Sequence, residues 1–148
     1  MLLSKSCVYG LRASLYLAYK KEEGFISIKE ISEELDISFH FLTKILQQLT
    51  AAGFMESYKG PNGGIKLTSS GMESKLIDLV TLIDGPELFT ECVLGLPGCG
   101  SAEPCALHDN WLVTRAGIQN MLEGITLFDL AAERKKSGLG ANINPDLS

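Results

Sequence analysis

Apolar residues in the first third of the chain recur every three or four positions in three successive segments, which is the spacing of one helix face. The first segment ends near Gly24, and its stripe comprises Val8, Leu11, Leu15, Ala18 and Tyr19. The second starts at Ser27, which forms a capping-box pattern with Glu30. The third follows a very short connection, with Ser38 as its N-cap and Gly53 at its end. Its residues predicted to face inward are Phe41, Leu42, Ile45, Leu46 and Leu49. Two helices joined by so short a turn predict a helix-turn-helix.

A β-hairpin is predicted directly after these helices. The run FMESY is typical of a strand, KGPNGG is rich in turn-forming residues, and in IKL Lys66 alternates with Ile65 and Leu67. A helix-turn-helix followed by a hairpin is a winged helix. The two helices alone could also be a helical hairpin within a core. The β-hairpin that follows them makes that alternative less favoured.

A winged helix offers the N-terminal turns of its second motif helix to the major groove of DNA, while the hairpin tip reaches the backbone or the minor groove. The residue types and positions give seven candidate DNA contacts. They are Ser38, His40, Thr43 and Lys44 on the helix, and Lys59, Asn62 and Lys66 on the hairpin. Taken singly, Lys59 and Lys66 are more often ordinary solvated surface residues, and the same holds for His40.

A fourth helical pattern opens at Ser70, which forms a second capping box with Glu73, and it closes at Gly85 and Pro86. Its apolar positions are Met72, Leu76, Leu79, Val80 and Ile83. Glycine and proline make the following segment, 92–104, an irregular loop.

A long apolar helix is predicted to begin at Pro104, a residue suited to the first helical position. Its stripe comprises Leu107, Trp111, Ile118, Met121 and Leu122. A short helix follows from Thr126, with Asp129 three residues on, and the tail from Ser137 has too few apolar residues to hold a fixed structure. A dimer interface is the simplest explanation of the long helix, and folding back onto the winged helix is the alternative.

The predicted fold is therefore mainly α-helical with one small β-hairpin: a winged helix-turn-helix followed by a long C-terminal dimerisation helix. Residues 1–70 are expected to form the DNA-binding domain, 71–135 the cysteine loop and dimerisation helices, and 136–148 a disordered tail. A length of 148 residues excludes two large domains.

Charge is distributed unevenly between the two halves. The net charge is −5, yet residues 1–70 carry eight Lys or Arg and seven Asp or Glu, whereas residues 71–148 carry five and eleven. The acidity therefore lies in the second half. A surface that binds DNA phosphates must then be local to the first half, because the field at the contact face matters more than the total.

The composition, 45% hydrophobic and 21% charged, is typical of a soluble globular chain. No apolar run approaches the roughly 20 residues needed to span a bilayer. The segment MLLSKSCVYGLRASLYLAYKK has polar residues within a helical pattern, so it is interpreted as part of the fold and not as an export signal. We therefore expect a cytoplasmic protein without a membrane partner.

Three of the four cysteines lie with a histidine in ECVLGLPGCGSAEPCALH. Six residues separate Cys92 from Cys99, five separate Cys99 from Cys105, and two separate Cys105 from His108. Cys105 and His108 are expected to share a face at a helix start, where the helix dipole favours a thiolate. In a cytosolic protein such a cluster indicates metal or redox chemistry before structural disulfides.

The ligand set admits three interpretations. Zinc can be bound by three cysteines and a histidine, but structural zinc sites usually contain tight Cys-x(2–4)-Cys pairs that this segment lacks. A wide loop rich in glycine and proline suits a larger object, so a 2Fe-2S cluster is favoured over zinc. Unliganded thiols or a redox-active disulfide form the third interpretation.

With these motifs the chain resembles the IscR/NsrR/CymR superfamily of bacterial winged-helix regulators, from about Leu3 to Ala132. The stretches that carry the resemblance are YGLRASLYLA, SFHFLTKILQQLTAAGFMESYKGPNGGIKL and CVLGLPGCGSAEPCALHDNW. The resemblance implies a homodimer with a long dimerisation helix. In the cysteine-bearing branches it also implies an iron–sulfur cluster held by three cysteines, here Cys92, Cys99 and Cys105.

The chain departs from those relatives at three places. Its first two cysteines are separated by one residue more than is usual in the cluster-binding members. The fourth ligand is a histidine matching His108 in one branch and an acidic residue of the partner's first helix in another. Val8 stands at that helix position here and cannot ligate, so His108 is favoured, while Cys7 is interpreted as a small buried side chain. Lys59 replaces an arginine common in the family's wing.

The sequence thus predicts a transcriptional regulator, a repressor and not an enzyme, which binds a pseudo-palindromic operator in double-stranded DNA as a homodimer. It would sense redox state, nitric oxide or iron–sulfur status through the cluster. The alternative is a cluster-free interaction module regulated by thiol oxidation or by a partner protein.

Overall fold

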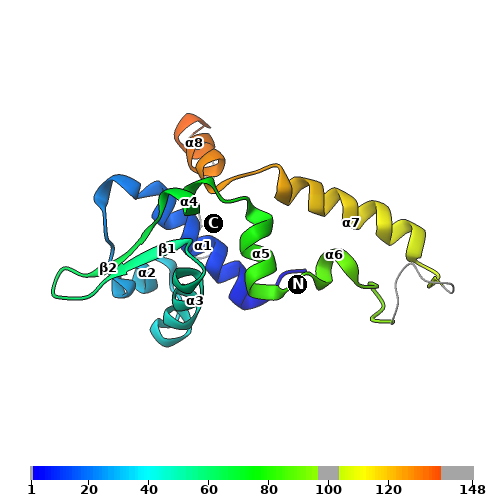
Figure 1. Ribbon diagram of the computed structural model, residues 1–148, viewed down its shortest axis with the longest axis horizontal. Helices are drawn as coiled ribbons and strands as arrows, with labels where there is room; N and C mark the ends of the chain where they lie inside the picture. The colour runs from blue at the N-terminus through cyan, green and yellow to red at the C-terminus, as the bar shows by residue number, and fades with distance from the viewer. Residues whose placement is uncertain (1, 97–103, 138–148) are drawn as a thin grey trace.

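The computed structural model describes residues 2–96 and 104–137. A winged helix-turn-helix forms the larger part, and a long helix extends from it (Figure 1). The elements of the winged helix are α1 (Lys5–Tyr19), a short 3-10 turn (Lys21–Glu23), α2 (Ile28–Leu35), α3 (Phe39–Ala51), β1 (Met55–Tyr58) and β2 (Gly64–Leu67). The predicted class, mainly helical with one hairpin, is confirmed.

The helix-turn-helix comprises α2 and α3. Ser27 caps α2 by accepting a hydrogen bond from the Glu30 amide at 3.1 Å, but the Glu30 carboxylate accepts from the Tyr16 hydroxyl at 3.2 Å and does not complete a capping box. Asp36 adopts a left-handed conformation, φ 52°, which turns the chain between the two helices. Ser38 is the N-cap of α3 as predicted, although its side chain makes no capping hydrogen bond.

The wing is an antiparallel pair in which Met55 lies opposite Leu67 and Tyr58 opposite Gly64. A third segment that the sequence did not predict extends it: Ile26 and Ile65 exchange both backbone hydrogen bonds, at 3.0 and 2.8 Å. The close approach requires glycine at position 64, because a Cβ there would lie 2.2 Å from the Ile26 carbonyl oxygen.

One hydrophobic core holds the winged helix together. The buried residues of α3 are Leu42, Ile45, Leu46 and Leu49, as predicted, and they pack with Ile31 and Leu35 of α2. Phe41, which was also predicted to face inward, is only half-buried and packs its ring edge-on against Tyr9.

The stripe predicted for α1 is wrong in detail. Val8, Leu11 and Leu15 are half-buried, whereas Ala13, Ser14 and Leu17 are among the buried residues of the helix. The reason is that α1 lies at the centre of the fold and contacts α2, α3, α5 and α8 on different sides, so more than one face is covered.

The single helix predicted from Ser70 is also wrong. Two helices occupy this region, α4 (Ser69–Glu73) and α5 (Leu76–Asp84), and Thr68 rather than Ser70 caps the first by accepting from the Gly71 amide at 2.9 Å. The break arises because the chain at Ser74 pairs with a distant segment. The Leu127 amide donates to the Ser74 carbonyl at 3.2 Å, and the Leu76 amide donates to the Ile125 carbonyl at 2.9 Å.

Three further helices follow: α6 (Glu87–Thr90), α7 (His108–Glu123) and α8 (Leu127–Ser137). Figure 1 shows α7 extending away from the winged helix, with α6 beneath it, while α8 returns to lie beside α4. The predicted helix start at Pro104 is wrong, because residues 105–107 form a turn and α7 begins at His108. Cys105 and His108 are therefore joined by this turn and do not share a helix face.

The predicted start of the last helix is confirmed. Thr126 and Asp129 form a reciprocal capping box, with both backbone-to-side-chain hydrogen bonds at 3.0 Å. The helix continues through Ser137, so the tail predicted from residue 136 starts too early, and 138–148 lie outside the described residues. Within the described ranges, no helix has the length and apolarity required to cross a membrane.

Candidate nucleic-acid interface and metal centre

The N-terminal turns of α3 lie on the surface of the winged helix. Ser38, His40 and Lys44 are exposed, and Thr43 is half-buried, with its hydroxyl donating to the Phe39 carbonyl at 2.7 Å. The four buried apolar residues of α3 pack into the core and fix the orientation of the helix. All four helix residues predicted from the sequence are thus accessible, with Thr43 partly covered.

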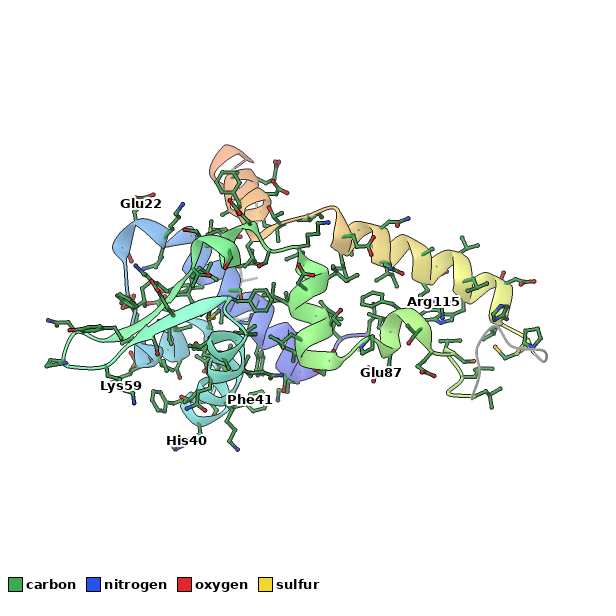
Figure 2. The ribbon with its side chains drawn as sticks, in the orientation of Figure 1. Glu22, His40, Phe41, Lys59, Glu87 and Arg115 are labelled. Atoms are coloured by element: carbon green, nitrogen blue, oxygen red, sulfur yellow. The ribbon has the colours of Figure 1, made fainter. Side chains whose placement is uncertain are left out.

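The hairpin places the three predicted wing residues differently. Lys59 and Asn62 are exposed at the tip, and Figure 2 shows Lys59 on the same side of the molecule as His40. Lys66 is half-buried on the strand. Its Nζ atom forms an ion pair with Glu56 at 3.1 Å and lies 4.7 Å from the ring centre of Phe25. Lys66 is therefore engaged within the hairpin, unlike the two tip residues.

A groove with a volume of about 610 Å³ runs between α3 and the wing. Phe39 and Thr43 line one wall, Tyr58 lines the other, and Lys29 and Lys59 are also among the lining residues. No sequence pattern predicts this groove, because it depends on how the wing packs against α2 and α3. Phe39 and Tyr58 are exposed aromatic residues at the predicted DNA surface that sequence reasoning did not select.

The second candidate site brings together two cysteines that are distant in sequence. The Sγ atoms of Cys92 and Cys105 lie 3.3 Å apart. A disulfide bond is about 2.05 Å long, whereas two sulfurs that bind one tetrahedral metal ion at about 2.3 Å are about 3.8 Å apart. The spacing is therefore closer to that of two ligands of one metal centre, and an opening of about half an ångström would reach it.

The other predicted ligands are His108 and Cys99. His108 begins α7, and its amide donates to the Cys105 carbonyl at 3.0 Å, so one backbone turn joins the two residues. Cys99 lies outside the described residues. Among residues 2–96 and 104–137, no three cysteine, histidine or acidic side chains converge closely enough to hold a metal ion. The donor set of soft thiols and an imidazole suits an iron–sulfur cluster or zinc.

Two residues of α7 hold the backbone beside Cys92. The Glu91 carbonyl accepts hydrogen bonds from the Trp111 indole at 2.9 Å and from the Arg115 guanidinium at 3.2 Å. Figure 2 shows Arg115 on the side of α7 that faces α6. Trp111 and Arg115 are four residues apart, and this spacing places both on one face of α7. The spacing is the only feature of the sequence that links them, and it does not show that both bind the Glu91 carbonyl.

The fourth cysteine has a different environment. Cys7 is fully buried between α1, α5 and α7, next to Val80 and Leu122, as the sequence predicted. Burial, reinforced by the negative charge of Asp84, raises the pKa of the Cys7 thiol to about 12. Asp84 also accepts a hydrogen bond from the Ser4 amide at 2.8 Å at the start of α1. This thiol is therefore protonated at neutral pH.

Comparison with known proteins gives consistent matches. Residues 3–133 match the profile of the Rrf2 family, whose description is iron-dependent transcriptional regulator. The HTH-type transcriptional regulator IscR of Aliivibrio salmonicida is 28% identical over 146 residues, which are 99% of this chain and 86% of that protein.

Two solved structures are similar over most of their length. CymR of B. subtilis, described as the global cysteine regulator, has a TM-score of 0.74 and 29% identity, with 88% of this chain and 96% of CymR covered. IscR of T. potens has a TM-score of 0.73 and 23% identity, with 95% and 93% covered. The second likeness shows a common fold.

Proposed function

The chain belongs to the Rrf2 family of transcriptional regulators, and from this membership we propose that it is a DNA-binding repressor that senses redox state, nitric oxide or iron–sulfur supply through a 2Fe-2S cluster. Its relatives are named as regulators, and the family consists of DNA-binding proteins and not of enzymes. We place it in the cytoplasm, where its DNA target would be accessible.

The observation that carries the cluster proposal is the separation of 3.3 Å between the Cys92 and Cys105 sulfurs. Folding brings two of the three cysteines together, at a separation closer to that of two metal ligands than to that of a disulfide. Cys92, Cys99 and Cys105 would supply three thiolates, and His108 would supply the fourth ligand. When bound, the cluster supplies a redox-active and chemically labile group that oxidants or nitric oxide can alter.

Hydrogen bonds within the protein position the backbone and the sulfur of Cys92. Trp111 and Arg115 fix the Glu91 carbonyl and thereby the backbone that precedes Cys92. The Leu94 amide donates to the Cys92 sulfur at 3.4 Å, and hydrogen bonds of this kind stabilise a thiolate and tune a cluster's potential. Zinc is the weaker candidate, since the loop lacks a tight cysteine pair.

We further propose that the protein acts as a homodimer that binds a pseudo-palindromic operator. Exposed apolar residues along α7 support the dimer: Leu112, Val113 and Met121. A twofold dimer presents two copies of α3 to half-sites about one helical turn apart or a multiple of that distance. Ser38, His40, Thr43 and Lys44 would face the major groove, with Lys59, Asn62 and Lys66 of the wing near the backbone or minor groove.

Anaerobic purification tests the cluster. We expect a coloured protein with iron and acid-labile sulfide in equal amounts, lost in Cys92→Ala, Cys99→Ala and Cys105→Ala but only weakened in His108→Ala, because water or a neighbouring side chain can fill one vacant position. Cys7→Ala is the matched control and should retain the cluster. Colourless protein without iron or zinc would overturn this proposal.

A second candidate function is favoured by the same sulfur pair. Two thiols at 3.3 Å can close to a disulfide after a small movement, so a cluster-free module regulated by thiol oxidation, or by a partner protein, is the alternative. Metal-free protein that gains a Cys92–Cys105 disulfide on mild oxidation, detected by peptide mass spectrometry, would support that alternative.

A further inference from the structure

The first turn of α3 carries an exposed aromatic side chain. Phe39 is 46% exposed, and within residues 2–96 and 104–137 its ring makes one aromatic contact, edge-on to His40 with ring centres 5.9 Å apart. It lines the groove between α3 and the wing. At the N-terminus of a recognition helix this ring is in reach of base edges in the major groove.

The charges around the groove indicate which partner covers this ring. Lys29 and Lys59 are among the residues that line the groove, and the exposed Lys44 lies farther along α3. Lysines beside aromatic side chains in one groove complement a nucleic acid, whose phosphates are negative while its sugars and base methyl groups are apolar. We therefore take DNA, and not an apolar small molecule or a peptide, as the occupant.

The chemistry of a phenyl ring then restricts what it can recognise. Phe39 neither donates nor accepts hydrogen bonds, so it cannot read the donor and acceptor pattern of a base pair. The C5-methyl group of thymine is the apolar feature that the major groove displays, and phenylalanine is one of the side chains that contact it. On the same face, the Thr43 hydroxyl already donates its proton to the Phe39 carbonyl, so it can only accept from a base.

We propose that Phe39 is a specificity-determining residue that selects thymine in each half-site by packing against its C5-methyl group. This inference rests on the proposed DNA-binding function and specifies which feature of the operator the first turn of α3 reads. Each half-site would then contain one thymine whose methyl group matters for affinity, while its hydrogen-bonding edge does not contact Phe39.

The test uses duplexes selected by the wild-type dimer from a randomised pool. Each thymine is replaced singly by deoxyuridine, which removes only the methyl group, and affinity is measured by fluorescence anisotropy at fixed salt. We expect one thymine per half-site at which the replacement weakens wild-type binding about fourfold, equivalent to about 0.8 kcal/mol for one methyl group. Phe39→Ser should bind more weakly and lose this discrimination, and Phe39→Leu should retain part of it.

Tyr58→Ser is the matched control, since Tyr58 is a 58% exposed aromatic residue on the opposite wall. It should leave the ratio of thymine to deoxyuridine affinities unchanged. Unaltered discrimination in a folded Phe39→Ser variant, or no methyl-sensitive thymine in the selected sites, would overturn the inference while leaving DNA binding intact. If the wild type selected no sequence at all, the proposed function itself would fail.

Discussion

Cys7 and Cys92 show that the environment of a cysteine, more than its presence, determines its chemistry. Both are buried, but Cys7 is enclosed by apolar residues and Asp84, whereas Cys92 faces a second thiol. The composition could not distinguish them. Spacing along the sequence sets three cysteines apart from the fourth, and the fold shows that Cys92 and Cys105 approach each other.

The raised pKa of Cys7 has a measurable consequence for stability. The folded thiol keeps its proton up to about pH 12, whereas the unfolded thiol titrates near 9.0, so the folded state binds more protons between these values. The free energy of unfolding therefore falls as pH rises through this window, by about 1.4 kcal/mol per pH unit from this group. Below the unfolded pKa the contribution is fully present.

Cys7→Ala should remove that slope. Urea denaturation of wild type and variant, measured from about pH 8 to about pH 11, should show a flatter decline for Cys7→Ala. At neutral pH the variant should be less stable by about 1 kcal/mol, because a buried sulfur is lost. Parallel pH profiles for the two proteins would contradict the assigned pKa.

The lysines of the winged helix should differ in their contribution to DNA binding, according to whether they already form contacts within the protein. Lys44 and Lys59 are exposed, so each alanine substitution should weaken operator binding and reduce the slope of log affinity against log salt by about one unit. Lys66 is paired with Glu56, so Lys66→Ala serves as a comparison and should change the slope less. Titrations at several salt concentrations provide the measurement, and an unchanged slope in both Lys44→Ala and Lys59→Ala would place the DNA surface elsewhere.

At the scale of elements, local patterns predicted α2, α3 and the hairpin well, because their ends are set by Ser27, Ser38 and the glycine-rich turn. The errors at Ser74 and Pro104 have different causes. The break at Ser74 is produced by backbone pairing with residues 125–127, and the late start of α7 follows from a turn at 105–107. Contacts between distant segments leave no periodic signal in either one.

The apolar surface of α7 gives a prediction at this scale. Val113 is 77% exposed on a helix that extends from the winged helix, and a buried unpaired carboxylate is costly. Val113→Glu should therefore shift the proposed dimer to monomer, measured by analytical ultracentrifugation at micromolar concentration. Val113→Leu, which keeps an apolar side chain at this position, should stay dimeric. A dimer of wild-type strength in Val113→Glu would remove α7 from the interface.

In the whole molecule, the cysteine site and the DNA surface lie on opposite parts of the chain, yet contacts connect them. The end of α5 is tied to the start of α1 where Asp84 accepts from Ser4. The same α5 leads through Gly85 to α6 and Cys92, whose backbone is held by α7. A change at the cysteines therefore bears directly on the helix that we assign to the dimer, and through α5 on the core of the winged helix.

This arrangement predicts coupling between the cluster and DNA. The DNA duplex fixes the distance between the two half-sites. A rotation of the two winged helices about α7 therefore loses contacts in one half-site, so DNA favours the conformation of the dimer that contacts both half-sites. We expect loss of the cluster to change operator affinity about tenfold or more, equivalent to about 1.4 kcal/mol. Linkage requires that operator DNA change the affinity for the cluster by the same factor.

The measurement is a titration of one operator with cluster-containing and cluster-free protein at identical salt, with the oligomeric state of both forms verified. The variant Cys92→Ala provides a cluster-free form that cannot be reloaded, and Cys7→Ala provides a cluster-containing control with one cysteine removed. Equal affinities of the two forms, both dimeric, would show that the site stabilises the fold without regulating DNA binding. A difference that is found only when the cluster-free form is monomeric would instead show that the cluster acts through assembly, since a monomer presents only one copy of α3 to the operator.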